Sequence, residues 1–245
     1  MNPVAQRILD TRSVSDGQTV YPLGHYHMDA GEGALLQAAI QQAQPKVSLE
    51  VGMAYGLSTL FICEALASLR SDATHIVIDP FQHQDWHGIG LRNAREAGYE
   101  RMLKFYEERS EFVLPRLLAE GVRLDFALID GWHTFDQALV EFYYISRMLR
   151  VGGIVAFDDA DWPSLSRLLR YIVEYPSYEV FKSKPKWKPS MLGRMRRRVV
   201  AIPQVAKLVH PTVRQRAWDL GIFDTCVAVR KISEDNRPIT WFPDF

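Results

Sequence analysis

Three carboxylates and a histidine stand in two short stretches of the sequence, and their chemistry fits metal-assisted catalysis. Asp130 and His133 follow one short apolar run, and Asp158 and Asp159 follow the next such run along the chain. If both runs are strands of one parallel sheet, these side chains converge at its carboxyl edge. Oxygen donors suit Mg²⁺, which lowers the pKa of a bound hydroxyl, and an imidazole can take the released proton. The pattern therefore predicts a Mg²⁺ site made by the three aspartates, with His133 and Asp130 as catalytic residues.

A purely structural interpretation of these residues stays open. Asp158 or Asp159 can cap a helix that begins near Pro163, and His133 can lie at a helix N-terminus with its ring bonded to a backbone carbonyl. Against this interpretation, three unpaired acids at one edge of a sheet repel each other. A bound cation relieves that repulsion.

A turn that contains two glycines follows the apolar run 47–51. Its sequence, EVGMAYGLS, begins with Glu50 and places Gly52 and Gly56 four residues apart. Glycine at the end of a strand lets the backbone turn sharply and approach a ligand closely. The spacing is not the G-x-G-x-x-G pattern that holds a pyrophosphate, and a carboxylate favours the ammonium and sulfonium of S-adenosylmethionine. The turn therefore predicts an S-adenosylmethionine site that includes these three residues and Ser58, although an ordinary strand-to-helix turn also uses glycine.

A fourth candidate for cofactor binding ends the next strand-like run. Asp79 stands before Pro80, 27 residues after Gly52. A carboxylate in this position can accept hydrogen bonds from both hydroxyls of a ribose. Asp79 does not indicate which of S-adenosylmethionine and NAD is the cofactor, because both contain a ribose. An aspartate before proline is also a common turn former, so Asp79 can have a purely structural role.

The elements that position these residues alternate between two periodicities. Apolar residues at i, i+3 and i+4 indicate helices, and short runs of Val, Ile, Leu and Phe indicate buried strands. Strands are expected at 47–51, 75–79, 102–106, 124–129, 153–157, 178–182 and 226–231. Helices are expected at 33–44, 57–69, 88–97, 110–120, 134–149 and 163–174. This order predicts an α/β fold with a Rossmann-like, doubly wound and mostly parallel sheet of seven strands that has helices on both faces.

Two further segments differ from this core. Residues 1–29 are polar and turn-rich, and we expect an N-terminal arm that packs on the domain. The S-adenosylmethionine-binding domain then comprises residues 30–182 and 219–245, and residues 183–218 form an insertion between the last two strands. The stretch 182–198 contains eight Lys or Arg residues and no acid. We expect this basic insertion to be a lid for an anionic or sugar-bearing acceptor; a solvated surface, a lipid or RNA contact, and the subunit contact of a homodimer are the alternatives.

The bulk composition is that of an ordinary globular protein. Hydrophobic residues make up 47% of the chain, and 29 basic side chains balance 29 acidic ones. A net charge of zero gives no overall attraction to nucleic acid, so no nucleic-acid partner is expected. The sequence shows neither a leader-like N-terminus nor an apolar stretch long enough to span a bilayer, which predicts a cytoplasmic protein. Cys63 and Cys226 lie in apolar runs and are expected to be buried free thiols.

The sequence resembles the class I S-adenosylmethionine-dependent methyltransferases, and within them the small-molecule O-methyltransferases of the catechol and macrolide-sugar types. The resemblance covers residues 31–170 and is clearest in LEVGMAYGLSTLFICEAL, HIVIDPF, LDFALIDGWHTFDQAL and LRVGGIVAFDD. It implies that Ser110 and Glu111 lie near the adenine and that Asp130 also contacts the cofactor. In metal-dependent members, an Asp at the position of Asp130 and an Asp-Asp or Asp-Asn pair at positions 158 and 159 bind Mg²⁺. The catechol type has a lysine base where this chain has His133.

The sequence therefore predicts an S-adenosylmethionine-dependent methyltransferase that carries out metal-assisted O-methylation of a small polar compound or natural product. A nucleotide-cofactor oxidoreductase and a non-catalytic S-adenosylmethionine-binding protein are the alternatives. Five aromatic or imidazole side chains are candidates for lining an acceptor pocket. They are His25, His27, Trp86, His87 and Trp162.

Overall fold

A seven-stranded sheet forms the centre of the protein, in a computed structural model that describes residues 1–24, 27–70, 72–183 and 225–241. The strands are β3 (Val47–Val51), β4 (Thr74–Ile78), β5 (Leu103–Tyr106), β6 (Leu124–Ile129), β7 (Leu149–Phe157), β8 (Tyr178–Ser183) and β9 (Val227–Lys231). Their order across the sheet is β5-β4-β3-β6-β7-β9-β8. The strands β3 to β7 pair in parallel, whereas β9 is antiparallel to both of its neighbours. The predicted mostly parallel sheet of seven strands is confirmed.

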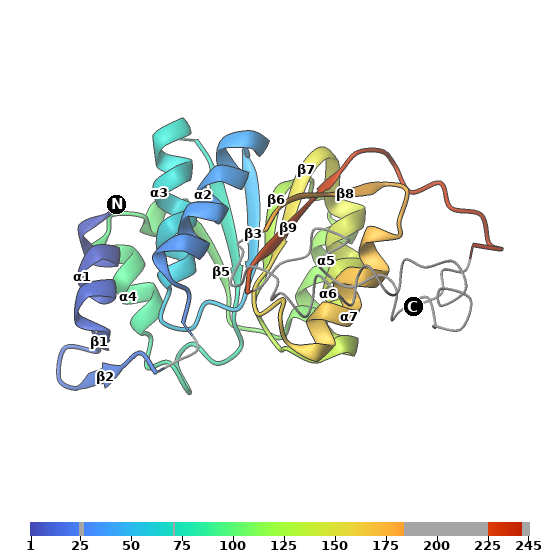
Figure 1. Cartoon of the computed structure of the whole chain (residues 1–245). Coiled ribbons are helices and arrows are strands. Elements are labelled where there is room, and N and C mark those ends of the chain that lie inside the picture. Colours follow the sequence, from blue (N-terminus) through green and yellow to red (C-terminus); the bar gives the residue numbers. More distant parts are fainter. Residues whose placement is uncertain (25–26, 71, 184–224, 242–245) are drawn as a thin grey trace, which may run out of the picture.

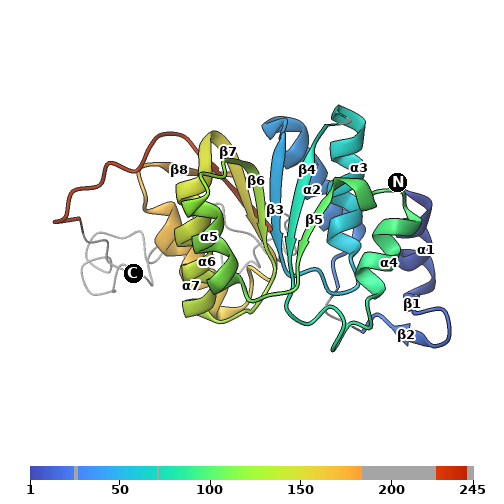
Figure 2. The same ribbon diagram turned by 180° about the vertical axis from the view of Figure 1, so that it is seen from behind.

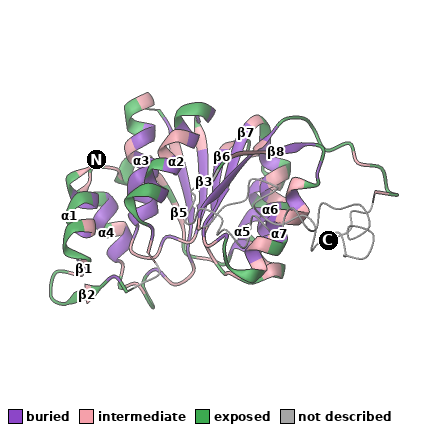
Figure 3. Cartoon of the chain, viewed as in Figure 1, coloured by how far each residue is buried: buried purple, intermediate pink, exposed green. Residues whose placement is uncertain are grey.

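Helices cover both faces of this sheet (Figures 1 and 2). One face carries α2 (Ala30–Ala43), α3 (Leu57–Leu69) and α4 (Ile89–Glu96), the other carries α5 (Ser110–Ala119), α6 (Phe135–Met148) and α7 (Pro163–Val173), and a 3₁₀ turn, η1 (Glu100–Met102), precedes β5. Successive side chains of β6 point to opposite faces of the sheet and enter two different hydrophobic clusters. Phe126 and Leu128 pack with the first group of helices, whereas Ala127 and Ile129 pack with the second. Figure 3 shows the resulting pattern, with buried strands between helices whose outer faces are exposed.

The N-terminal residues form a helix that the sequence analysis missed. Helix α1 (Pro3–Thr11) begins with proline, which suits the first helical position. The side chain of Asn2 caps it by accepting a hydrogen bond from the Val4 amide at 2.9 Å. Three apolar side chains of α1 are buried in the hydrophobic cluster that also contains α3. A two-stranded hairpin of β1 (Ser13–Ser15) and β2 (Val20–Pro22) follows.

Two element boundaries differ from the sequence prediction by more than two residues. Helix α2 begins at Ala30, three residues early, because Asp29 and Glu32 form a capping box that fixes its first turn. Strand β7 begins at Leu149, four residues early. The glycine pair Gly152 and Gly153 interrupts its apolar pattern, so that the first part of the strand looked like a loop.

The turn between β3 and α3 packs backbone directly against backbone. Gly52 has a φ of +86° and donates its N–H to the carbonyl oxygen of Ile78 at 2.9 Å. A Cβ atom at this position would overlap the carbonyl oxygen of Asp130, which follows β6. Because a side chain has no room there, the position requires glycine. The contact holds the carboxyl ends of β3, β4 and β6 together.

We expect Gly52→Ala to lower the free energy of unfolding by about 3 kcal/mol or more, because a backbone clash adds to the cost of a positive φ. Gly98→Ala is the matched control. Gly98 has a similar φ of +83°, but a Cβ there would meet no atom within 4 Å, so a loss of only about 1 kcal/mol is expected. Urea unfolding followed by circular dichroism measures both values. Equal losses in the two variants would show that the close approach to Asp130 adds nothing.

Candidate functional site

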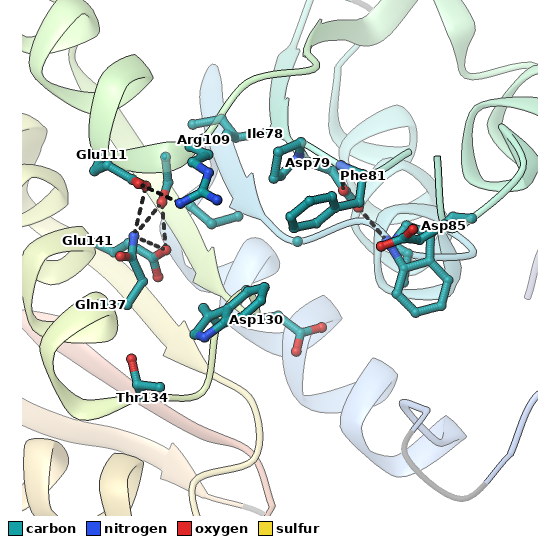
Figure 4. A pocket seen from close by; sticks show the side chains of 18 of the residues that line it. Ile78, Asp79, Phe81, Asp85, Arg109, Glu111, Asp130, Thr134, Gln137 and Glu141 are labelled. Carbon is teal, nitrogen blue, oxygen red and sulfur yellow. Dashed lines mark hydrogen bonds and ion pairs between the residues drawn. The ribbon is translucent and has the colours of Figure 1, made fainter. Parts of the chain in front are cut away.

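A cavity of about 630 Å³ opens at the carboxyl ends of β3, β4 and β6. Doubly wound sheets bind their ligands at this edge. Figure 4 shows the cavity from close by, with Asp79 on one side and Glu111, Gln137 and Glu141 on the opposite side. Asp130 lies between these two groups in the same view. The cavity therefore lies where the sequence analysis expects the cofactor.

Of the residues predicted to bind the cofactor, four line this cavity: Gly52, Asp79, Ser110 and Asp130. Three others lie outside its lining: Glu50, Gly56 and Ser58. Gly56 is the residue before α3, where its φ is +82° and a Cβ would lie only 3.0 Å from the carbonyl oxygen of Gly90, so that a side chain would be strained there. Ser58 is buried in the first turn of α3. Neither residue lines the cavity.

Glu50 is buried within the core and not in the cavity wall. Its Oε2 accepts a hydrogen bond from Thr59 Oγ1 at 2.6 Å and lies 3.1 Å from Nε2 of His75. The other ring nitrogen of His75, Nδ1, lies 2.9 Å from Ser48 Oγ. Oε1 of Glu50 is buried and has no hydrogen-bond partner among the described residues. The carboxylate thus acts on the site through its charge, which helps to raise the pKa of Asp130.

Asp79 ties the end of β4 to the glycine turn. Its Oδ2 accepts hydrogen bonds from the amides of Met53 at 3.0 Å and Ala54 at 2.9 Å. Its Oδ1 accepts a hydrogen bond from the amide of Phe81 at 2.9 Å. Oδ2 is fully used, because Nε2 of Gln82 also lies 3.5 Å from it. Oδ1 accepts only one hydrogen bond, so Asp79 keeps capacity for one ligand hydroxyl while it holds the turn.

The ring of His133 lies between two of the predicted metal ligands. Its Nδ1 is 3.1 Å from Oδ2 of Asp159, and its Nε2 is 3.6 Å from Oδ1 of Asp130. The ring of Trp162 packs edge-on against it, with centroids 5.1 Å apart. Trp162 is also the N-cap of α7 and no side chain caps that helix, so the alternative role of Asp158 or Asp159 as a helix cap is wrong.

Burial and like charge raise the pKa of both Asp130 and Asp158 well above the ordinary value of an aspartate. Burial is the largest cause for each residue. The charges of Glu50 and Asp159 add to it for Asp130, and the charges of Asp130 and Glu32 add to it for Asp158. This edge of the sheet therefore holds several acids whose mutual repulsion a positively charged ligand would reduce.

The predicted metal ligands have suitable chemistry, but their arrangement does not form a metal site. Carboxylate oxygens are the donors that Mg²⁺ prefers. Within the described parts of the chain, however, no three His, Cys, Asp or Glu side chains are grouped so that they could hold a metal ion. The ring of His133 occupies the space between Asp130 and Asp159. As arranged, Asp130, Asp158 and Asp159 therefore do not fit a bound Mg²⁺ ion.

Aromatic rings give the cavity part of its wall. Phe81, Trp86 and Trp132 line it, and the ring centroids of Phe81 and Trp132 are 6.1 Å apart. Of the side chains proposed for an acceptor pocket, Trp86 lines the cavity, whereas His27, His87 and Trp162 lie outside its lining and His25 falls outside the described residues. Stacking surfaces of this kind suit a flat ring or a sugar.

Glu141 lines the cavity, and the sequence analysis missed it. Its side chain lies on α6, and its Oε1 accepts hydrogen bonds from Ser110 Oγ at 2.7 Å and from Gln137 Nε2 at 3.4 Å. Burial raises the pKa of Glu141 to about 7, although these hydrogen bonds lower it. A signal was present in the sequence, because position 141 falls on the same apolar face of the helical pattern as Ala138 and Ile145. An acid on such a face is uncommon.

We expect Glu141→Gln to stabilise the protein more at pH 8 than at pH 5. The folded state holds the proton of Glu141 up to about pH 7, whereas the unfolded state loses it near pH 4.3, so wild-type stability falls across this interval. Glutamine does not titrate and avoids this loss, which amounts to about 2–3 kcal/mol. Urea unfolding of both proteins at several pH values measures the difference. A difference that does not change with pH would contradict the raised pKa.

Solved structures share the fold. The O-methyltransferase TomG of Streptomyces achromogenes, solved with S-adenosylmethionine, has a TM-score of 0.64 at 14% identity, over 95% of this chain and 91% of that chain. An O-methyltransferase of Bacillus cereus, solved with S-adenosylhomocysteine, has a TM-score of 0.60 at 16% identity, over 74% of this chain and 83% of that chain. The chain thus shares the Rossmann-like fold of these two methyltransferases.

Sequence comparisons agree with this class. A family model described as a methyltransferase domain matches residues 49–160. The flavonoid 3',5'-methyltransferase of Vitis vinifera is 30% identical over 134 residues, which are 54% of each chain. The caffeoyl-CoA O-methyltransferase of Stellaria longipes is 28% identical over 53% of this chain and 52% of that protein. The chain thus spans about half the length of these relatives, and the predicted resemblance to the small-molecule O-methyltransferases is confirmed.

Proposed function

We propose that the protein binds S-adenosylmethionine in the cavity and transfers its methyl group to a hydroxyl of a small molecule. The observation that carries this proposal is the meeting of the glycine turn, Asp79 and Asp130 in one cavity at the carboxyl edge of the sheet. The match of residues 49–160 to a methyltransferase domain supports it. A dinucleotide fits less well, because the turn lacks the pyrophosphate-binding glycines and acids surround it.

Methyl transfer from a sulfonium depends mainly on alignment. The acceptor oxygen must lie in line with the bond between the methyl carbon and the sulfur, and its proton must leave as the new bond forms. In this proposal His133 accepts that proton, because its ring is held at the site by Asp159 at 3.1 Å. Asp159 then stabilises the imidazolium that results.

We expect His133→Gln to lower kcat by about 10²- to 10⁴-fold, because glutamine cannot accept the proton. Affinity for S-adenosylhomocysteine should change little, since the proposal assigns His133 to the proton of the acceptor and not to a contact with the cofactor. His83→Gln is the matched control, because His83 is exposed and pairs with Glu107. Methylation rates and calorimetric affinities of both variants test this role. Full activity of His133→Gln would assign the base to another group.

The order of the aspartates in the sequence predicts metal assistance, whereas their arrangement in the structure does not fit a bound Mg²⁺ ion, and the two expectations can be distinguished by experiment. On the arrangement described, we expect no saturable binding of Mg²⁺ to EDTA-treated protein in calorimetry. We likewise expect no loss of activity in EDTA. The matched variant is Asp158→Asn, which keeps the shape of the side chain and removes its charge. Saturable Mg²⁺ binding in the wild type that is lost in Asp158→Asn would restore the metal-assisted mechanism.

The acceptor is proposed to be a small hydroxyl compound that is anionic or bears a sugar. The aromatic walls formed by Trp86 and Trp132 support a ring-shaped acceptor. The basic insertion at 183–218 lies outside the described residues except for its first position, so its role as a lid stays a prediction. The cytoplasmic location, the homodimer and the lack of a nucleic-acid partner likewise stay predictions. In the described ranges, none of the helices has the length and apolar character needed to cross a membrane.

Calorimetry with S-adenosylhomocysteine and with NADH tests the proposal directly. We expect saturable binding of S-adenosylhomocysteine and none of NADH. The opposite result would favour the oxidoreductase. Incubation with S-adenosylmethionine and a panel of phenols, sugars and carboxylated alcohols, read by mass spectrometry, then tests transfer. Binding without a mass increase of about 14 Da (one CH₂) in any acceptor would favour the non-catalytic alternative.

A further inference from the structure

A buried carboxylate in the cavity wall has one oxygen without a hydrogen-bond partner. Glu141 lines the cavity and is 1% exposed. Its Oε1 accepts a hydrogen bond from Ser110 Oγ at 2.7 Å, whereas its Oε2 is buried and has no partner among the described residues. Such an oxygen lowers stability unless a donor reaches it. The position therefore points to a ligand that supplies a hydrogen-bond donor.

The side chains around Glu141 direct their own donors at one another. Gln137 Nε2 donates to Ser110 Oγ at 2.9 Å and to Glu111 Oε2 at 3.2 Å. The hydroxyl of Ser110 in turn donates to Glu141. Figure 4 shows this group on the side of the cavity opposite Asp79. Oε2 of Glu141 is therefore a hydrogen-bond acceptor that these side chains leave for a ligand. The complementary group on the ligand is a hydrogen-bond donor such as an amine.

The position of this acceptor selects one part of the cofactor. The proposed function puts the cofactor in this cavity, and here we place its ribose at Asp79, as the sequence predicts, and its sulfonium toward Asp130. We place the adenine toward Ser110, as the resemblance implies, and therefore beside Glu141, which lines the cavity on the side opposite Asp79. Its exocyclic amino group is a hydrogen-bond donor. Resting on that proposed function, we propose that Glu141 is a specificity-determining residue whose Oε2 accepts a hydrogen bond from the amino group of the adenine.

The protonation of Glu141 provides a second readout of this contact. Burial raises its pKa to about 7. Among the charged groups that face Glu141, Glu111 on α5 raises the pKa of Glu141 further and His133 before α6 lowers it. Asp130 after β6 also faces it, and the charge of Glu141 raises the pKa of Asp130. A hydrogen bond from an amino group stabilises the ionised carboxylate. Cofactor binding near pH 7 then releases a proton from Glu141 into the buffer.

The test compares S-adenosylhomocysteine with S-inosylhomocysteine, in which a carbonyl oxygen replaces the amino group. Calorimetry at pH 8, where Glu141 is ionised, gives both dissociation constants. The wild type should prefer S-adenosylhomocysteine by roughly 10- to 100-fold, as a hydrogen bond to a charged group predicts. Glu141→Met should lose most of this preference. The matched control is Glu120→Met, which changes an exposed acid at the end of α5, outside the cavity, and should keep the preference.

Each outcome separates this inference from the function on which it rests. A wild type that prefers S-adenosylhomocysteine and a Glu141→Met variant that keeps the full preference would overturn the inference alone. A wild type that binds neither nucleoside would overturn the proposed function and the inference with it. If Glu141→Met does not fold, Glu141→Gln carries the test through proton release at pH 7, measured in two buffers of different ionisation enthalpy. Release that is equal in the wild type and Glu141→Gln would contradict the role of Glu141.

Discussion

The turn after β3 lies directly against the end of β6, with no side chain between Gly52 and the carbonyl oxygen of Asp130. Asp79 fixes the same turn from the other side, through the amides of Met53 and Ala54. Three strand ends are thereby held in one rigid arrangement. Asp130 contributes its backbone to this contact and its side chain to the cavity. A change in the packing of the turn therefore also moves a carboxylate that lines the cavity.

The carboxyl edge of the sheet concentrates negative charge in a buried region. Burial and mutual repulsion raise the pKa of Asp130 and Asp158, and burial raises that of Glu141. Such an arrangement is unfavourable for the empty protein and favourable for a ligand that carries a positive charge and hydrogen-bond donors. S-adenosylmethionine, with its sulfonium, ammonium and amino groups, has these properties. The large apolar clusters on both faces of the sheet provide the stability that such a site requires.

Strand ends could be predicted from the sequence because each depends on a local pattern. The sequence pattern therefore predicts the edge of the sheet at which the acids after β4, β6 and β7 lie. The position of the His133 ring between two aspartates depends on how loops from two strands pack, and no local pattern encodes that contact. Glu50 shows the same limit, because its contact with His75 joins neighbouring strands within the core. Glu141 and the cap formed by Asn2 differ in this respect, because local patterns do indicate them. Glu141 is an acid on the apolar face of a helix, and Asn2 precedes a proline that begins a helix.

The place of β9 in the sheet has a consequence for how the chain folds as it is synthesised. This late strand is inserted between β7 and β8 and pairs with both, so that Ile154 lies opposite Arg230. Until the ribosome has released Val227–Lys231, β7 has an open edge and β8 has no neighbouring strand. Open edges of this kind can pair with other chains. A nascent chain that stalls before β9 therefore exposes strand edges through which it can pair with other chains.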